Sequence, residues 1–188
     1  DFIVSGEASR KNGTFTLKSG SIKRHFEYDT FVIDVEKEYK ELSGEEQQHF
    51  FLETNKRKIG LYDCEGEGYA AFWRILCHDR FMQAYKSADG QEWVNVGGVL
   101  LSDDEVMLYQ GFKVAGGVGL KFTHYTVYHD PHLTLQNFPE GFKAELCDTE
   151  GSPMRAALFD AQMAAQLFLG CPQNGVLKIS DVADNVVY

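Results

Sequence analysis

The sequence predicts an all-β, mostly antiparallel protein. Short stretches with apolar residues at alternate positions recur along the chain, while helical periodicity is almost absent. Glycine, asparagine and aspartate separate these stretches, as expected for strands that are joined by tight turns. At 188 residues the chain is long enough to bury a real core, and we expect it to fold as two domains.

Composition and charge argue against several classes of partner. A hydrophobic fraction of 44% with 24% charged residues is ordinary for a folded globular protein. The net charge of −10 repels phosphate backbones and anionic lipid surfaces, so we expect no nucleic acid partner. No apolar run approaches the roughly 18 residues that a membrane helix needs, so we also expect no membrane insertion.

Turn dipeptides and alternating side chains define strands in the first half of the chain. Asn12-Gly13 predicts a hairpin into a strand at 14–17, because this pair tolerates the positive φ angles of a type I′ turn. Residues 30–36 alternate apolar and polar side chains, which predicts one buried and one solvated face. Asp89-Gly90 predicts a further turn into a strand over 91–96, which Gly97-Gly98 are expected to end.

Five further segments of this half have a strand or loop pattern. A strand pair is predicted over 69–77 and 80–86, joined by His78-Asp79. The polar stretch 38–48 is expected to form a loop or one short helix before the apolar run at 49–53. A β-branched and aromatic run at 123–128 predicts another strand.

A domain boundary is predicted at Asp130-Pro131. Proline donates no ladder hydrogen bond and restricts the residue before it, so the preceding strand is expected to end there. The boundary divides the chain into domains 1–129 and 130–188. Within the second domain, residues 154–169 leave helix and strand open, because five alanines favour a helix. We favour two strands there.

One stretch of the first domain resembles a known family. The strand FWRIL (72–76) precedes FMQAYKSADGQEW (81–93). This pair resembles the hairpin of concanavalin A-like (laminin G-like) jelly-roll domains, in which a tryptophan-leucine-arginine strand precedes a tyrosine-serine-x-aspartate-glycine-x-x-tryptophan turn. The segment VGLKFTHYTVY (118–128) resembles the closing strand of these domains. The resemblance implies an antiparallel jelly-roll sandwich over about residues 1–128.

The chain departs from the family pattern in two places. Lys86 stands where the family has an aromatic residue, and the closing strand lacks the common Phe-Asp pair. No ligand site of the family is therefore carried over to this chain. Residues 131–188 resemble small β-sandwich units that are appended to secreted or virion proteins, which implies a second, smaller β-sandwich domain.

The patterns expected of an enzyme are missing. A glycoside hydrolase needs two carboxylates about 5 to 10 Å apart. Asp34, Glu36 and Glu38 share one strand face, but they lack the family's glutamate-x-aspartate-x-x-glutamate arrangement, and we favour a solvated outer face. Neither a nucleophile elbow nor a phosphate-binding loop is present. We predict no catalytic residues and no enzymatic activity, with a hydrolase as a third interpretation.

Metal sites have weak candidates. Two groups carry suitable side chains, namely His124, His129 and His132 with Asp130, and the hard-oxygen cluster Asp103, Asp104 and Glu105. Irregular spacing across a proline turn argues against the first group, and a plain acidic loop explains the second. We predict no metal or cofactor, with a structural calcium at the acidic cluster as the alternative.

The four cysteines, Cys64, Cys77, Cys147 and Cys171, match neither a zinc nor a redox spacing. One disulfide in each half and buried free thiols both remain open. The cysteines alone therefore leave the cellular compartment open.

Aromatic residues provide the best functional lead. The apolar face of a sugar stacks on indole and phenol rings, while neighbouring polar side chains bind its hydroxyls. Trp73 stands beside Arg74, and Tyr62 precedes Asp63. These four are the predicted ligand-binding residues, whereas Trp93 is expected to pack against its own turn.

We therefore predict a non-catalytic, lectin-like module of a secreted bacterial or phage surface protein. Its partner would be a glycan or a host-surface polysaccharide, and its location extracellular or on a virion or cell surface. The alternative is a structural assembly or decoration domain of a virion or cell-surface fibre, with a protein partner and no glycan site. Solvent-facing aromatic residues would favour the first, and a large flat apolar patch the second.

Overall fold

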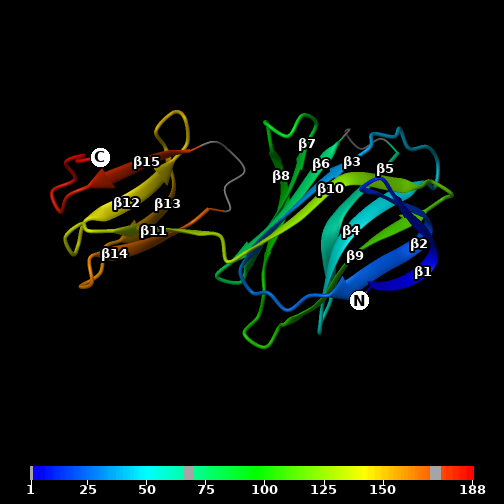
Figure 1. The fold of residues 1–188 in the computed structure, drawn as a ribbon, viewed down its shortest axis with the longest axis horizontal. Coiled ribbons are helices and arrows are strands. Elements are labelled where there is room, and N and C mark those ends of the chain that lie inside the picture. The colour runs from blue at the N-terminus through cyan, green and yellow to red at the C-terminus, as the bar shows by residue number, and fades with distance from the viewer. Residues whose placement is uncertain (1, 66–69, 170–174) are drawn as a thin grey trace. The chain divides into compact units, whose positions relative to one another are not determined.

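The computed structural model describes residues 2–65, 70–169 and 175–188, and these residues form strands and no helix (Figure 1). All strand pairs are antiparallel, so the predicted all-β, antiparallel class is confirmed. No helix long and apolar enough to cross a membrane occurs in the described part of the chain.

The chain divides into two compact units, Asp1–His129 and Asp130–Tyr188. The division falls at the Asp130-Pro131 break. That each unit is an independent domain stays a prediction.

The first unit is one curled sheet of ten strands. Its path is β5-β4-β9-β2-β10-β3-β6-β7-β8, and β1 pairs with β2 beside that path. In chain order these strands are β1 (Phe2–Lys11), β2 (Thr14–His25), β3 (Phe31–Lys37), β4 (Gln47–Thr54), β5 (Lys58–Cys64), β6 (Phe72–His78), β7 (Phe81–Ser87), β8 (Val94–Leu100), β9 (Met107–Ala115) and β10 (Leu120–His129).

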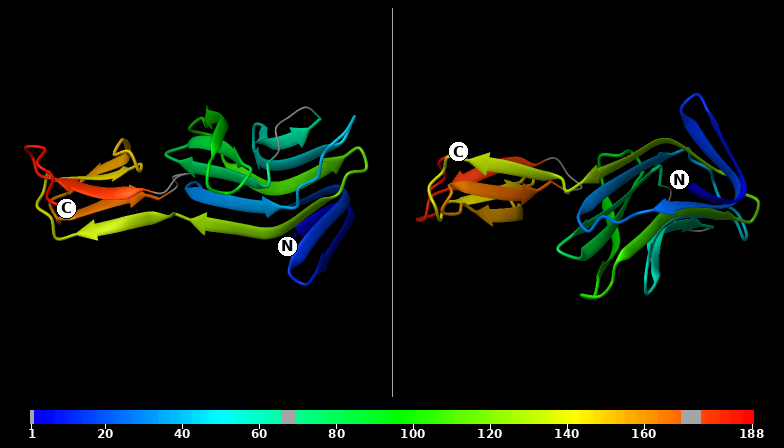
Figure 2. Two further views of the ribbon diagram at one scale, coloured as in Figure 1. Left: turned by 90° about the horizontal axis from the view of Figure 1, so that it is seen from above. Right: turned by 60° about the horizontal axis from the view of Figure 1, so that its bottom comes forward.

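The sheet separates into two layers where β2 and β10 diverge. Residues 15–17 of β2 pair with 120–122 of β10, but residues 20–25 of β2 pair with β9 instead. The rest of β10 pairs with β3. One layer is therefore β5-β4-β9-β2 and the other β10-β3-β6-β7-β8, and the curl is visible from two directions in Figure 2.

The core of the first unit lies between these layers. Phe50 of β4 and Trp73 of β6 stack with ring centroids 6.5 Å apart, and both side chains are fully buried. Phe50 also stacks on Phe112 of β9 at 5.0 Å. Because successive strand residues point to opposite faces, β3 buries Phe31, Ile33 and Val35 as predicted. Val32, which was expected on the solvated face, is buried as well.

The turn signals were largely correct, with two shifts. Asn12 and Gly13 have φ angles of 49° and 80°, which confirms the hairpin between β1 and β2. The strand after Asp89-Gly90 begins only at Val94, because the Asp89 carboxylate accepts hydrogen bonds from the following backbone amides. Gly97-Gly98 do not end β8: the strand runs to Leu100 with a register shift beside them, where a bulge leaves Val96 unpaired.

Two open questions about the first unit are settled by the described residues. The polar stretch before β4 is a loop, and the helix alternative is wrong there. Cys64 and Cys77 are free thiols, so no disulfide joins them. Burial raises the pKa of the Cys77 thiol to about 12, which makes it a poor nucleophile. Cys171, like residue 69 of the predicted strand 69–77, lies outside the described residues.

The second unit consists of a pair and a triplet of strands. Strands β11 (His132–Gln136) and β14 (Ala164–Phe168) pair with one another, and β12 (Lys143–Cys147) lies between β13 (Pro153–Leu158) and β15 (Val176–Ser180). Its core contains Ala144, Phe159, Ala165, Leu167 and Ile179. The two strands favoured over 154–169 are confirmed: β13 pairs with β12 and β14 with β11, and this pairing outweighs the helix propensity of alanine.

Replacement of Trp73 tests the packing between the layers. We expect Trp73→Ala to lower the free energy of unfolding by about 3–5 kcal/mol, because it leaves a cavity where a fully buried ring stood. Trp93→Ala, at a half-buried position, is the matched control and should cost less. Urea unfolding followed by circular dichroism measures both changes. Equal losses of unfolding free energy in the two variants would contradict the role of Trp73 in the packing between the layers.

Candidate functional site

A groove lies where the two ends of the curled sheet approach one another. One wall is β5, through Gly60, Leu61 and Tyr62, and the other is formed by the end of β7, the turn after it and β8. The groove has a volume of about 550 Å³. The residues of the second wall are Lys86, Ser87, Ala88, Asp89, Glu92, Val94 and Val96.

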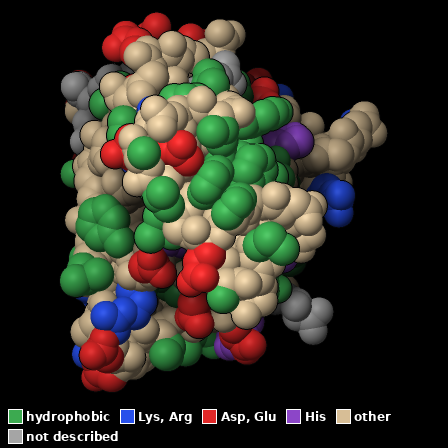
Figure 3. Space-filling view, turned by 90° about the vertical axis from the view of Figure 1, so that its left-hand side faces the viewer, with side chains coloured by type: hydrophobic (Ala, Val, Ile, Leu, Met, Phe, Trp, Pro, Cys, Tyr) green, Lys and Arg blue, Asp and Glu red, His purple; other side chains and the backbone are tan. Residues whose placement is uncertain are grey.

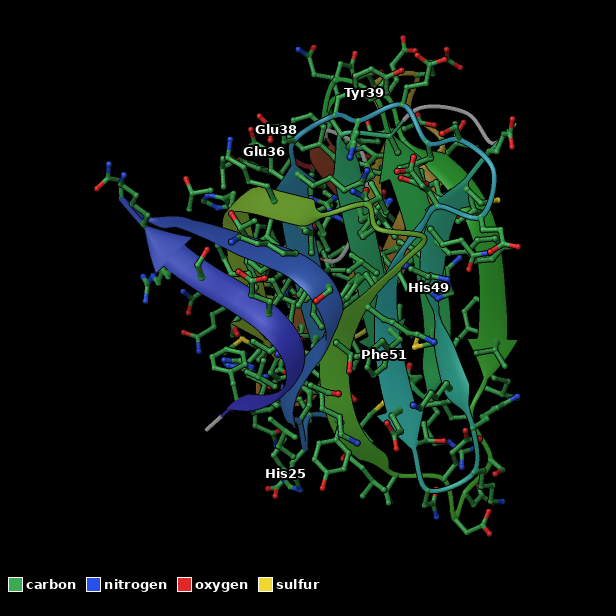
Figure 4. All side chains as sticks on the ribbon, turned by 90° about the vertical axis from the view of Figure 1, so that its right-hand side faces the viewer. His25, Glu36, Glu38, Tyr39, His49 and Phe51 are labelled. Atoms are coloured by element: carbon green, nitrogen blue, oxygen red, sulfur yellow. The ribbon has the colours of Figure 1, made fainter. Side chains whose placement is uncertain are left out.

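Tyr62 gives the groove an accessible aromatic surface. Its side chain is 49% exposed, and its ring centroid lies 5.6 Å from that of His49 on β4. Figure 4 labels His49 and Phe51 on β4. Lys86 contacts Tyr62 from the second wall: its Nζ lies 5.9 Å from the ring centroid and donates to the Tyr62 carbonyl oxygen at 2.6 Å. A ring in this position can stack on a flat, partly apolar ligand.

A buried charge network lies behind Tyr62. Asp63 faces the space between the layers, where it pairs with Lys37 Nζ at 2.9 Å and with Lys86 Nζ at 2.7 Å. The side chains of Lys37 and Asp63 are only 2% and 9% exposed. Lys37 also donates to Gln48 Oε1 at 3.0 Å. Two ammonium groups thus share one carboxylate.

Burial lowers the pKa of Lys37, and Asp63 opposes that change. The Lys37 ammonium also lies 4.8 Å from the centroid of the Trp73 ring, so the network adjoins the core tryptophan. Lys86 contributes to the lowered pKa of Lys37 through charge repulsion. The network therefore fixes Lys86, a groove residue, to the interior of the sandwich.

The four predicted ligand-binding residues occupy three different environments. Tyr62 lines the groove and is accessible, whereas Asp63 is buried behind it. Trp73 is 0% exposed, so its proposed role as an exposed platform is corrected: it is a core residue. Arg74 points to the outer face, where it binds Asp34 with two hydrogen bonds of 2.5 and 2.7 Å.

Strand geometry explains why sequence neighbours did not become site neighbours. Trp73 and Arg74 are consecutive in β6, so they point to opposite faces of the sheet. The guanidinium of Arg74 packs over the ring of Trp93 at 4.4 Å, and Trp93 Nε1 donates to the Gly90 carbonyl at 3.2 Å. Lys86 and Glu92 were missed as groove residues. For Lys86, the departure from the family pattern at this position was a sequence signal that could have identified it.

Most of the carboxylates considered for metal binding or catalysis are paired with cations. Asp103 pairs with Arg80, Asp104 with Lys56 at 2.5 Å, and Glu105 with Arg57 at 2.9 Å. In the acidic row of Asp34, Glu36 and Glu38, Asp34 binds Arg74 and Glu38 pairs with Lys121. Figure 4 labels Glu36 and Glu38. The described residues include no group of three or more histidine, cysteine or acidic side chains that could hold a metal ion.

Comparisons with known proteins show similarity in structure only. No family model and no curated protein matches the sequence. A functionally unknown protein from Saccharomyces cerevisiae is similar with a TM-score of 0.49 and 11% identity, over 69% of this chain and 95% of that one. A mutant of the GH43 protein BlXynB from Bacillus licheniformis is similar with a TM-score of 0.47 and 12% identity. The match covers 63% of this chain and 33% of that protein, and neither similarity assigns a family or a function.

Removal of the Asp63 charge tests the buried network. Asp63→Asn removes the carboxylate that pairs with the buried ammonium of Lys37, and we expect it to lower the free energy of unfolding by about 3–5 kcal/mol. The double variant Lys37→Met with Asp63→Asn should recover part of that loss, because Lys86 is the more accessible lysine. Urea unfolding of the three proteins measures both effects. A double variant that is less stable than Asp63→Asn would contradict the shared-charge arrangement.

The ion pair of Glu105 with Arg57 predicts a pH dependence. Hydrogen bonds from Arg57 lower the pKa of Glu105 to about 2, below its usual value of 4.5. Because the pKa is lowered in the folded state, the stabilisation is complete above pH 4.5 and is lost as the pH falls towards 2. Glu105→Gln should therefore reduce the melting temperature at pH 7 and much less at pH 2. Glu41→Gln, at an exposed position, is the control, and an equal reduction at both pH values would contradict the pair.

Proposed function

We propose that the first unit is a non-catalytic carbohydrate-binding module, with the groove beside Tyr62 as its sugar site. The exposed phenol ring on the groove wall carries this proposal. The apolar face of a pyranose packs on such a ring, and its hydroxyls need donors and acceptors around it. Lys86 supplies donors at the groove, while Asp89 and Glu92 supply acceptors.

The size of the groove fits a small ligand. About 550 Å³ lies within the range of roughly 300–1,000 Å³ that is usual for small-molecule sites. Val94 and Val96 on the second wall are exposed to 64% and 47%, so an apolar surface faces Tyr62 across the groove. A sugar with one apolar face and a polar rim matches this combination of walls.

The finer parts of the sequence interpretation belong to the same proposal. We take the two-layered first unit as a concanavalin A-like jelly roll, on the resemblance carried by residues 72–93, and the second unit as a small appended β-sandwich. The protein would then act outside the cell or on a virion surface, as part of a secreted bacterial or phage protein. Its partner would be a glycan or host-surface polysaccharide.

A glycan array with the whole chain tests the sugar site. We expect binding that Tyr62→Ala weakens about tenfold or more, because the stacking surface is lost. Tyr128→Ala is the matched control, since Tyr128 is 48% exposed but does not line the groove. Circular dichroism of each variant checks the fold. Binding that Tyr62→Ala leaves unchanged would move the site elsewhere, and no binding across a broad array would refute the carbohydrate proposal.

Exposed apolar residues of the second unit favour a second function, assembly with other proteins. Five of its side chains are between 57% and 77% exposed, namely Leu158, Val176, Val182, Val186 and Tyr188. Hydrophobic side chains gather on the face that Figure 3 displays. Exposed apolar surface of this kind marks interaction sites in soluble proteins. If no glycan on the array binds the chain, an assembly or decoration role with no glycan site would be favoured.

A further inference from the structure

A second pocket opens in the first unit where β2 leaves β10 to pair with β9. It has a volume of about 470 Å³ and shares no lining residue with the groove beside Tyr62. Figure 4 shows the β1–β2 hairpin standing out from the rest of the sheet, and residues of both strands line the pocket. We call it the arginine pocket; its lining includes Phe2, Arg10, Phe15, Lys23, Arg24, Gln110, Phe122, His124 and Tyr125.

The arginine pocket is cationic although the chain is acidic. The chain has 28 acidic residues against 18 lysines and arginines, yet among the residues that the structure describes no aspartate or glutamate lines this pocket. Lys23 pairs with Glu53 at 3.3 Å. Across the described residues, no carboxylate lies within ion-pair distance of Arg10 or Arg24. Within the described part of the chain, the two guanidinium groups at this opening therefore have no acidic partner.

Neutral groups hold Arg24 in place. The amide of Gln110, a 3% exposed side chain, lies between the guanidinium of Arg24 and the Tyr125 hydroxyl. The Arg24 guanidinium carbon is 5.6 Å from the Tyr125 ring centroid and 5.9 Å from that of Phe2. Contact with rings orients the planar guanidinium without neutralising it. Arg24 thus stays available for an anion.

Aromatic rings form the apolar wall of the pocket. Phe15 and Phe122 stack at 4.9 Å, and Phe122 stacks on Phe112 at 4.8 Å. Phe15 and Phe122 are only half-buried, so their outer surfaces remain open to the pocket. A ligand that fits must combine an anionic group for Arg24 with an apolar or planar body for these rings.

We propose that the arginine pocket binds a small organic carboxylate. One edge of the Arg24 guanidinium, Nε and Nη2, donates to the Gln110 oxygen, so the carboxylate pairs with the Nη1 and Nη2 donors of the other edge. Arg10 adds a second positive charge at the opening. The body of the ligand packs on Phe15 and Phe122. Two classes of ligand of this size carry a carboxylate, namely aromatic acids and uronic acid sugars.

Titration calorimetry of the whole chain tests this site with phenylacetate and its neutral analogue phenylacetamide. Phenylacetate is expected to bind and the amide to bind at least about tenfold more weakly, because the charge-assisted hydrogen bonds are lost. Galacturonate and galactose form the second pair and distinguish a sugar acid from an aromatic acid. Binding of either carboxylate above its neutral partner supports the proposal and identifies the source.

Variants assign the binding to the pocket. Arg24→Gln should weaken carboxylate binding at least about tenfold, and Arg10→Gln, at an exposed position that tolerates replacement, should weaken it less. Arg80→Gln is the matched control, because Arg80 pairs with Asp103 outside the pocket. Circular dichroism confirms that each variant is folded.

Three results would overturn the proposal: no preference for either carboxylate over its neutral partner, unchanged binding in both Arg24→Gln and Arg10→Gln, or sulfate binding as tightly as phenylacetate. The outcome is independent of the groove, since Tyr62→Ala should leave carboxylate binding intact.

Discussion

The stacking of Phe50 on Trp73 between the two layers is the contact on which the rest of the first unit depends. It fixes which face of β4 and of β6 is buried, and the two-residue period of a strand then decides the direction of every neighbour. Tyr62 reaches the surface because Leu61 and Asp63, on either side of it, point inward. Arg74 reaches the outer face for the same reason, since Trp73 and Ile75 are both buried.

The same constraint places charge inside the sandwich. Lys37 and Asp63 continue inward-facing rows of apolar residues, and each would be costly to bury alone. They meet at the end of the sandwich, where Lys86 joins them from β7. A buried network of this kind holds β5 against β7 at a place where no backbone ladder joins the two strands. The groove wall is thereby tied to the core.

The two openings of the first unit differ in chemistry. The groove between the ends of the sheet combines Tyr62 with donors and acceptors of both charges, which suits a neutral polar ligand. The arginine pocket, at the divergence of β2 and β10, has two guanidinium groups and an aromatic wall, which suits an organic anion. Both openings follow from a sheet that curls without closing, since each lies where neighbouring strands lack a continuous ladder.

The sequence by itself determined the all-β class, the hairpin at Asn12-Gly13, the buried face of β3 and the break at Asp130-Pro131, because turn chemistry and alternation act over a few residues. Tertiary structure alone decided that Trp73 is core, that Lys37 and Lys86 share Asp63, and that Arg10 and Arg24 have no acidic partner among the described residues. Alternation shows that a strand has two faces, but only the packing of distant strands decides which face is buried. Likewise a charge is compensated or not according to residues that lie far away in the chain.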